Sequence, residues 1–321
     1  MTKLWPLGKT LAPMMHDLGM NQRKDHLDLF AVSILLACFT FWGMQQVLVK
    51  ATLAEVPPLL QAGIRFAGAT VLLWFWCQWR GIRLWERDGS LAMGLLAGGL
   101  FAIEFVCLFV GLQFSSASRV TVFLYTSPLW VAVLVPLAVP SERLARLQWL
   151  GLAFAFLAVA FTLREGFLAP EVQGQWRGDV LGVLAGMFWG LTTLVIRATR
   201  LSRISPEKLL FYQVALSGVL LPLGSWWRGE DWSTPWGALT WTSLSLQVVI
   251  GAFVTYLAWM WMLGRYPATK VSAFTFLTPV FSVLFGTLWL GEAITPALVG
   301  ALVLIGAGIA LVNHRPARPR A

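Results

Sequence analysis

Long apolar runs separated by short polar segments occupy most of the 321 residues. A helix rises about 1.5 Å per residue and the hydrocarbon core of a bilayer is about 30 Å thick, so one crossing needs about 20 mainly apolar residues. The runs do not alternate between apolar and polar positions, as the strands of a membrane barrel would. The pattern predicts an all-α integral membrane protein with ten transmembrane helices. The runs lie at residues 28–50, 57–79, 91–112, 119–139, 146–164, 179–199, 206–227, 239–263, 270–290 and 295–313.

The longest break between runs divides the chain into two halves of five runs each. The first run follows a polar leader and is too long for the h-region of a signal peptide, so we expect it to be retained. The expected organisation has five parts. They are a cytoplasmic tail at 1–26, a first five-helix unit at 27–164, an extracytoplasmic linker at 165–178, a second five-helix unit at 179–313 and a cytoplasmic tail at 314–321.

Composition and charge agree with a membrane protein of fixed orientation. Hydrophobic residues make up 58% of the chain and charged residues 12%, with a mean hydropathy of +0.71, which excludes an ordinary soluble enzyme. When the N-terminus is placed inside, most of the 24 lysines and arginines fall in inner loops and tails. The net charge of +9 therefore reports orientation rather than a nucleic-acid surface, for which no soluble domain is expected.

The two halves carry related sequences. Residues 41–52 match residues 188–199, and residues 117–128 match residues 268–279. Because each half has an odd number of helices, the second half enters the membrane from the opposite side. The sequence thus predicts two inverted five-helix repeats with both termini cytoplasmic. This is the architecture of many secondary transporters, in which a site between the halves opens to either side of the membrane.

Several short motifs recur at matching places in the halves. They are the Trp42-Gly43 and Trp189-Gly190 steps, Thr126-Ser127-Pro128 with Thr278-Pro279, and Gly291-Glu292 before a glycine-rich last helix. With these motifs the chain resembles the EamA-type transporters of the drug/metabolite transporter superfamily over about residues 28–313. The resemblance implies a bacterial inner-membrane carrier with a central cavity that exports amino acids or other small metabolites. Relatives that exchange phosphorylated sugars or nucleotide sugars leave a second substrate class open.

Two charged residues fall inside apolar runs. Glu104 lies near the middle of the third run, where a charge costs at least about 2.5–3.5 kcal/mol and should face the bundle interior. A buried carboxyl can bind a proton or an amino group, so protons are a candidate coupling ion. Arg65, in the second run, could pair with Glu104, reach the interface or bind a substrate carboxylate, and packing is the interpretation we favour for it.

Polar and aromatic residues on the cavity helices implied by the resemblance complete the candidate site. Amides and hydroxyls fit a neutral or zwitterionic solute, and aromatic rings fit the apolar walls around it. Packing between helices is the alternative for each. The candidates are Gln45, Gln46, Thr192, Thr193, Trp42, Tyr125, Trp189, Tyr256, Trp259 and Phe274.

Pro128 and Pro279 occupy matching places inside the fourth and ninth runs. A proline removes one intrahelical hydrogen bond and kinks the helix. Bent helices at corresponding places of two repeats are the best sequence indication of the moving, site-forming elements. We expect both prolines to mark hinges.

The remaining functional classes find little support in the sequence. The three histidines lie in the tails, no metal-ligand spacing or phosphate-binding loop is present, and we expect no aspartate within the membrane. We expect no enzyme, no cofactor and no metal site. The expected partners are a small-molecule substrate and the lipid bilayer, without nucleic acid, and the oligomeric state stays open. A non-transporting receptor or structural protein remains an alternative, but it leaves the inverted repeat unexplained.

Overall fold

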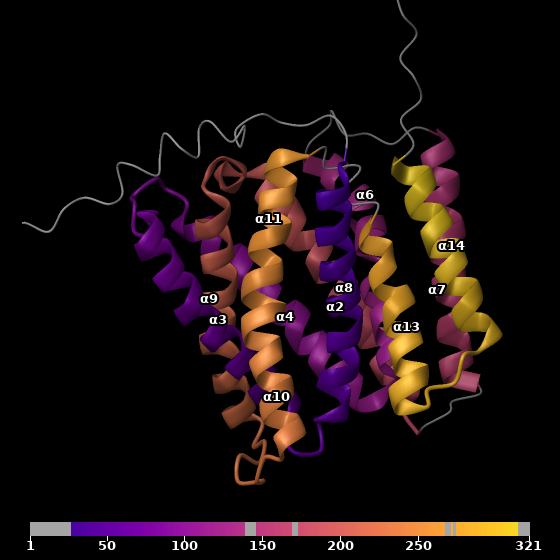
Figure 1. The fold of residues 1–321 in the computed structure, drawn as a ribbon. Helices are drawn as coiled ribbons and strands as arrows, with labels where there is room; N and C mark the ends of the chain where they lie inside the picture. Colours follow the sequence, from indigo (N-terminus) through magenta and orange to yellow (C-terminus); the bar gives the residue numbers. More distant parts are fainter. Residues whose placement is uncertain (1–26, 139–145, 169–172, 267–270, 272–273, 314–321) are drawn as a thin grey trace, which may run out of the picture.

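The computed structural model describes residues 27–138, 146–168, 173–266, 271 and 274–313, and this part of the chain forms helices and turns without any strand. The predicted tails at 1–26 and 314–321 lie outside the described residues, as do residues 169–172 of the predicted linker. Figure 1 shows the helices packed side by side in one bundle. In chain order they are α2 (Leu29–Ala51), α3 (Pro58–Arg80), α4 (Leu91–Phe114), α5 (Ala117–Leu124), α6 (Ser127–Ala138), α7 (Arg146–Leu168), α8 (Gln175–Ala198), η2 (Arg200–Arg203), α9 (Pro206–Trp227), α10 (Ala238–Leu246), η3 (Gln247–Val254), α11 (Thr255–Arg265), η4 (Phe274–Phe276), α13 (Leu277–Leu290) and α14 (Pro296–Asn313).

The prediction of an all-α membrane protein is confirmed. Within the described residues, eight helical segments are long and apolar enough to cross a membrane, and two further apolar helices, Phe274–Leu290 and Pro296–Ala307, are shorter. Large apolar side chains cover the outside of the bundle: Trp79, Leu137 and Trp227 are each more than 70% exposed. A water-soluble surface would not carry so much apolar area, whereas lipid tails solvate it.

We call the end of the bundle where α2 begins the tail end, and the end where α8 begins the linker end. The α3 and α9 helices pack together at one edge of the bundle, and α7 and α14 pack together at the other (Figure 1). Between these edges, α2 packs on α13 and α8 packs on α6. The α3–α9 and α7–α14 contacts each join helices at the same place in the two halves, and the α2–α13 contact corresponds to the α8–α6 contact in the sequence repeat.

Two glycines show how closely the related contacts match. A Cβ added at Gly43 of α2 would lie 2.6 Å from Phe281 Cβ and 2.8 Å from main-chain atoms of α13. A Cβ added at Gly190 of α8 would lie 2.7 Å from Trp130 Cβ in α6. Since Gly43 matches Gly190 in the repeat, and Phe281 matches Trp130, the same close approach of backbones is made twice. Only glycine leaves room for it.

Three predicted runs are not uniform α-helices. The run at 119–139 is interrupted at Tyr125 and Thr126, so that α5 ends and α6 begins inside the bundle. The run at 270–290 starts with the short helix η4 before α13. Pro128 and Pro279 stand in the first turn of α6 and α13, where a missing N–H is tolerated. The run at 239–263 contains the π-helix η3, a form often found at functional sites.

Candidate functional site

Most of the predicted aromatic residues gather around α2 and α11. The indole N–H of Trp42 donates to the Thr255 hydroxyl at 2.7 Å. The Trp42 ring centre lies 5.8 Å from that of Tyr256 and 6.0 Å from that of Trp259, both edge to face. Phe274 of η4 packs against the same apolar cluster. The structure therefore places four of the predicted residues side by side, from helices distant in the chain.

Two further predicted aromatics meet next to this group. The ring of Tyr125, at the end of α5, lies 5.6 Å from the ring of Trp189 in α8. Both pack on the main apolar core, which Tyr256 also contacts. Through Tyr256 the two aromatic groups are continuous. Tyr125 itself stands at the break between α5 and α6.

Arg65 and Glu104 lie buried in this region from α3 and α4. Arg65 is 1% exposed and Glu104 is 4% exposed. The Arg65 Nη2 donates to the Tyr256 hydroxyl at 3.3 Å, and the guanidinium carbon lies 5.3 Å from the Phe105 ring centre. Among the described residues, Arg65 Nε and Nη1 and Glu104 Oε2 have no hydrogen-bond partner. The two charges influence each other electrostatically but form no ion pair in the described part of the chain.

Gln45 and Gln46 of α2 are both buried, and neither side-chain carbonyl has a partner among the residues described. Gln45 reaches Gly251 of the π-helix so closely that any Cβ on Gly251 would overlap with Gln45 Oε1. Thr192 and Thr193 of α8 donate instead to carbonyl groups of their own helix, at 2.9 and 3.0 Å. The side-chain carbonyls of the two glutamines are therefore available as hydrogen-bond acceptors, whereas the threonine hydroxyls donate within their own helix.

A buried ion network closes the linker end. Arg119 of α5 donates to Asp179 of α8 at 2.7 Å and to Glu165 of α7 at 2.5 Å. The Ser115 hydroxyl donates to Asp179 at 2.6 Å, and Thr295 before α14 donates to Glu165 at 3.1 Å. Arg119 and Asp179 are 2% and 0% exposed. The network ties helices of both halves together.

A second set of contacts stands beside this network. Glu292, after α13, accepts hydrogen bonds from the backbone N–H groups of Ala117 and Ser118 at 2.6 and 2.9 Å. A carboxylate at this place complements the positive end of the α5 dipole. Lys50 at the end of α2 donates to two carbonyl groups at the C-terminal end of α4, at 2.9 and 2.5 Å. Glu292 and Lys50 therefore fasten the linker end further.

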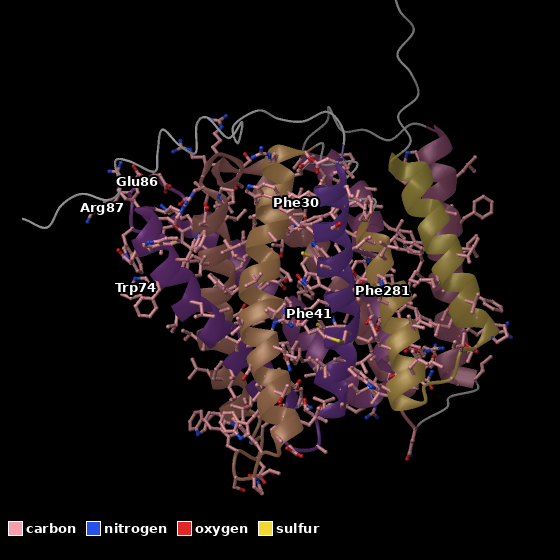
Figure 2. All side chains as sticks on the ribbon, viewed as in Figure 1. Phe30, Phe41, Trp74, Glu86, Arg87 and Phe281 are labelled. Atoms are coloured by element: carbon pink, nitrogen blue, oxygen red, sulfur yellow. The ribbon has the colours of Figure 1, made fainter. Side chains whose placement is uncertain are left out.

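The tail end carries exposed basic residues, among them Arg200 and Arg203. Two cavities of about 580 and 560 Å³ lie there, and both are lined by Arg200 and Arg203. Lys208 of α9 donates to Asp88 at 2.9 Å. Hydrogen bonds from Ser90 and Lys208 hold the pKa of Asp88 well below its usual range. Figure 2 shows Glu86 and Arg87 of the same loop at the outer edge of this end.

Sequence reasoning missed the network at the linker end. The expectation that the membrane carries no aspartate is wrong, because Asp179, the first residue of the predicted run at 179–199, lies buried within α8. The α7 helix likewise continues past Arg164 through Glu165 to Leu168. Both acidic residues stay in helices because Arg119 neutralises them. The available signal was charge complementarity: Arg119 and Asp179 each begin a predicted run and Glu165 begins the predicted linker, so all three belong to the same end of the predicted bundle.

Apolar helices of membrane length, packed through related contacts around buried polar residues, define a multi-pass helical membrane protein. The sequence profile of the EamA-like transporter family matches residues 29–164 and 176–314. The chain belongs to this family, and it is a multi-pass membrane transporter of the bacterial inner membrane.

Several curated relatives match over nearly their whole length. The uncharacterized transporter YvbV of Bacillus subtilis is 29% identical over 294 residues, covering 88% of this chain and 92% of that protein. A probable amino-acid metabolite efflux pump of Salmonella typhimurium is 24% identical, covering 90% and 94%. A solved crystal structure superposes with a TM-score of 0.60 at 22% identity, covering 87% and 95%, and so supports the fold alone.

Proposed function

We propose that the protein is a secondary-active transporter that exports amino acids or related small metabolites by alternating access. In this proposal the ten predicted helices form two inverted repeats, at 27–164 and 179–313, around a midplane site. Both tails are cytoplasmic, so the tail end faces the cytoplasm and the linker end faces outward. The excess of basic residues at the tail end supports this orientation, and the repeat-related packing supports the pairing of the two halves.

One observation carries the proposal: two helices are interrupted at matching places of the repeat. The α5–α6 break at Tyr125 and Thr126 corresponds to the passage from η4 to α13 at Phe276 and Leu277. Discontinuous helices at corresponding places are typical of the site-forming elements of secondary transporters. Pro128 and Pro279 follow the two breaks, and we assign hinges there.

The linker-end network gives the proposed mechanism a closed state. Arg119, Asp179 and Glu165 join α5, α8 and α7; Arg119 and Asp179 are buried, and Glu165 is 23% exposed. For the site to open outward, Arg119 must separate from Asp179, because these residues lie on helices that the network holds together. Substrate would enter from the cytoplasmic tail end, and breaking the network would release it outside.

The proposed substrate site consists of the residues gathered between the two ends. Its rings are edge-to-face neighbours, which gives an apolar wall, and its buried amides supply unsatisfied acceptors. The Salmonella relative, a probable amino-acid metabolite efflux pump, supports this substrate class. The proposed members are Trp42, Gln45, Gln46, Glu104, Tyr125, Trp189, Thr192, Thr193, Tyr256, Trp259 and Phe274. Glu104 is the proposed acceptor if protons drive export.

The test uses purified full-length protein in liposomes loaded with individual amino acids. We expect saturable uptake of at least one labelled amino acid, accelerated by the same unlabelled compound inside. Empty liposomes and liposomes with heat-denatured protein are the controls. A flux that rises linearly with concentration without counterflow would contradict a carrier. Counterflow of a sugar phosphate in place of amino acids would contradict the substrate class while leaving alternating access intact.

A further inference from the structure

Two opposite charges stand close to each other in the bundle without neutralising each other directly. We propose that Arg65 binds the carboxylate of the substrate and that Glu104 binds its ammonium group. The transported class is then α-amino acids with both groups free. This inference rests on the proposed transport function and assigns Arg65 a role in recognition that the helix-packing interpretation does not give it.

The unused donors of Arg65 are the first support. Its side chain is 1% exposed, and its Nη2 donates to the Tyr256 hydroxyl at 3.3 Å. Nε and Nη1 have no hydrogen-bond partner in the part of the chain that the structure describes. A buried guanidinium with unused donors is costly unless a ligand or water completes its hydrogen bonds. A carboxylate is the acceptor that a guanidinium matches best.

A second buried arginine in the same chain shows what a structural role looks like. Every nitrogen of Arg119 is bonded: Nε and Nη2 to Asp179, Nη1 to Glu165, and Nη2 also to the Thr162 carbonyl. Arg119 is therefore complete without a ligand. Arg65 is just as buried, and among the described residues its Nε and Nη1 lack such partners. The contrast indicates that Arg119 holds helices together, whereas Arg65 has donors left for an anionic ligand.

Glu104 supplies the opposite end of the site. It is 4% exposed, its Oε2 has no partner among the described residues, and it lies within electrostatic range of Arg65 and Tyr256. A ligand with a single charge would satisfy one residue and leave the other unmatched. A zwitterion satisfies both. The low dielectric of the interior strengthens each contact.

The surrounding rings fit the rest of such a molecule. The Arg65 guanidinium lies 5.2 Å from the Phe66 ring centre, 5.3 Å from that of Phe105 and 5.9 Å from that of Tyr256. Cation–π contacts with these three rings stabilise the guanidinium where it lies. The aromatic wall that continues through Tyr256 to Trp42 offers an apolar surface to a side chain. Apolar amino acids are the best match.

The test compares matched compounds in counterflow with the wild-type protein. L-phenylalanine and L-leucine carry both charges. Phenethylamine and isoamylamine lack the carboxylate, and 3-phenylpropionate and 4-methylpentanoate lack the ammonium group. We expect counterflow of at least one amino acid, with its amine and acid analogues transported about tenfold or more less efficiently, because each leaves a buried charge unmatched.

Arg65→Gln and Arg65→Lys test the assignment of the carboxylate end. Arg65→Gln should abolish the preference for the amino acid over its amine, and Arg65→Lys should retain part of it. Arg80→Gln is the control, since Arg80 lies exposed on the same helix beside Trp76. If Arg65→Gln does not fold, the assignment is tested by Arg65→Lys and by the matched compounds with the wild-type protein. Saturable counterflow of the amines alone, or an unchanged preference in a folded Arg65→Gln, would overturn the site and leave the carrier standing. Linear flux of every compound would overturn both.

Discussion

Replacing Asp179 with Asn removes one charge from the linker-end ion network. Asp179 is fully buried and accepts from Arg119 Nη2 at 2.7 Å, from Arg119 Nε at 3.2 Å and from the Ser115 hydroxyl at 2.6 Å. The variant keeps the shape of the side chain but leaves Arg119 with Glu165 as its remaining carboxylate partner. Removing one partner of a buried pair costs about 3–5 kcal/mol. Because Glu165 stays 2.5 Å from Arg119, we expect the free energy of unfolding to fall by about 3 kcal/mol.

The assay is thermal unfolding of purified protein in one detergent, with a double-mutant cycle. Asp179→Asn and Arg119→Gln should each lower the Tm by about 5–10 °C. The double variant should lose less than the sum, with a coupling of about 0.5–3 kcal/mol. Arg177→Gln, at an exposed arginine of the same end, should change the free energy of unfolding by less than about 0.5 kcal/mol. Fully additive losses would refute the argument, because they would mean that the two residues act independently.

Three further outcomes follow from other parts of the molecule. Gly43→Ala and Gly190→Ala should each destabilise the protein by about 1–3 kcal/mol through overpacking. Gly99→Ala, where a Cβ meets no atom within 4 Å, should be neutral or stabilising. Equal Tm shifts for all three variants would refute the close-contact argument. Glu104→Gln should abolish the dependence of liposome transport on a pH gradient, and gradient-driven transport that persists at unchanged stability would exclude this residue as the proton acceptor. Because hydrogen bonds lower the pKa of Asp88 in the folded state, Asp88 stabilises the fold above its unfolded pKa, and this stabilisation is lost as the pH falls through the folded pKa. Asp88→Asn should therefore lower the Tm at neutral pH, and the difference from the wild type should shrink in strong acid. A series of Tm measurements against pH checks this.

The positions of the helices could be read from the sequence because hydropathy is a local property. The run at 206–227 coincides with α9, and the run at 57–79 is displaced from α3 by one residue. The interruptions were also foreseeable in part, since Pro128 and Pro279 pointed to them. Among the described residues, eight of the ten predicted runs form helices long enough to cross a membrane, and the last two runs form the shorter apolar helices.

The partners of the buried groups could not be read in the same way. The contact between Arg65 and Tyr256 joins residues 191 positions apart, and the contact between Arg119 and Asp179 joins residues 60 positions apart. Such contacts depend on how each helix is rotated about its axis and which neighbour it meets. Hydropathy does not encode that rotation. The π-helix at Gln247–Val254 was equally out of reach, because its apolar run fits an ordinary α-helix.

The two ends of the bundle differ in how their charges meet water. Arg119 and Asp179 at the linker end are 2% and 0% exposed, whereas Asp88 at the tail end is 29% exposed beside Lys208. Dissolved ions weaken exposed pairs and hardly reach buried ones. Raising the ionic strength should therefore loosen the tail end while the linker end holds. Salt concentration can therefore be used to weaken the tail end selectively, without any change to the sequence.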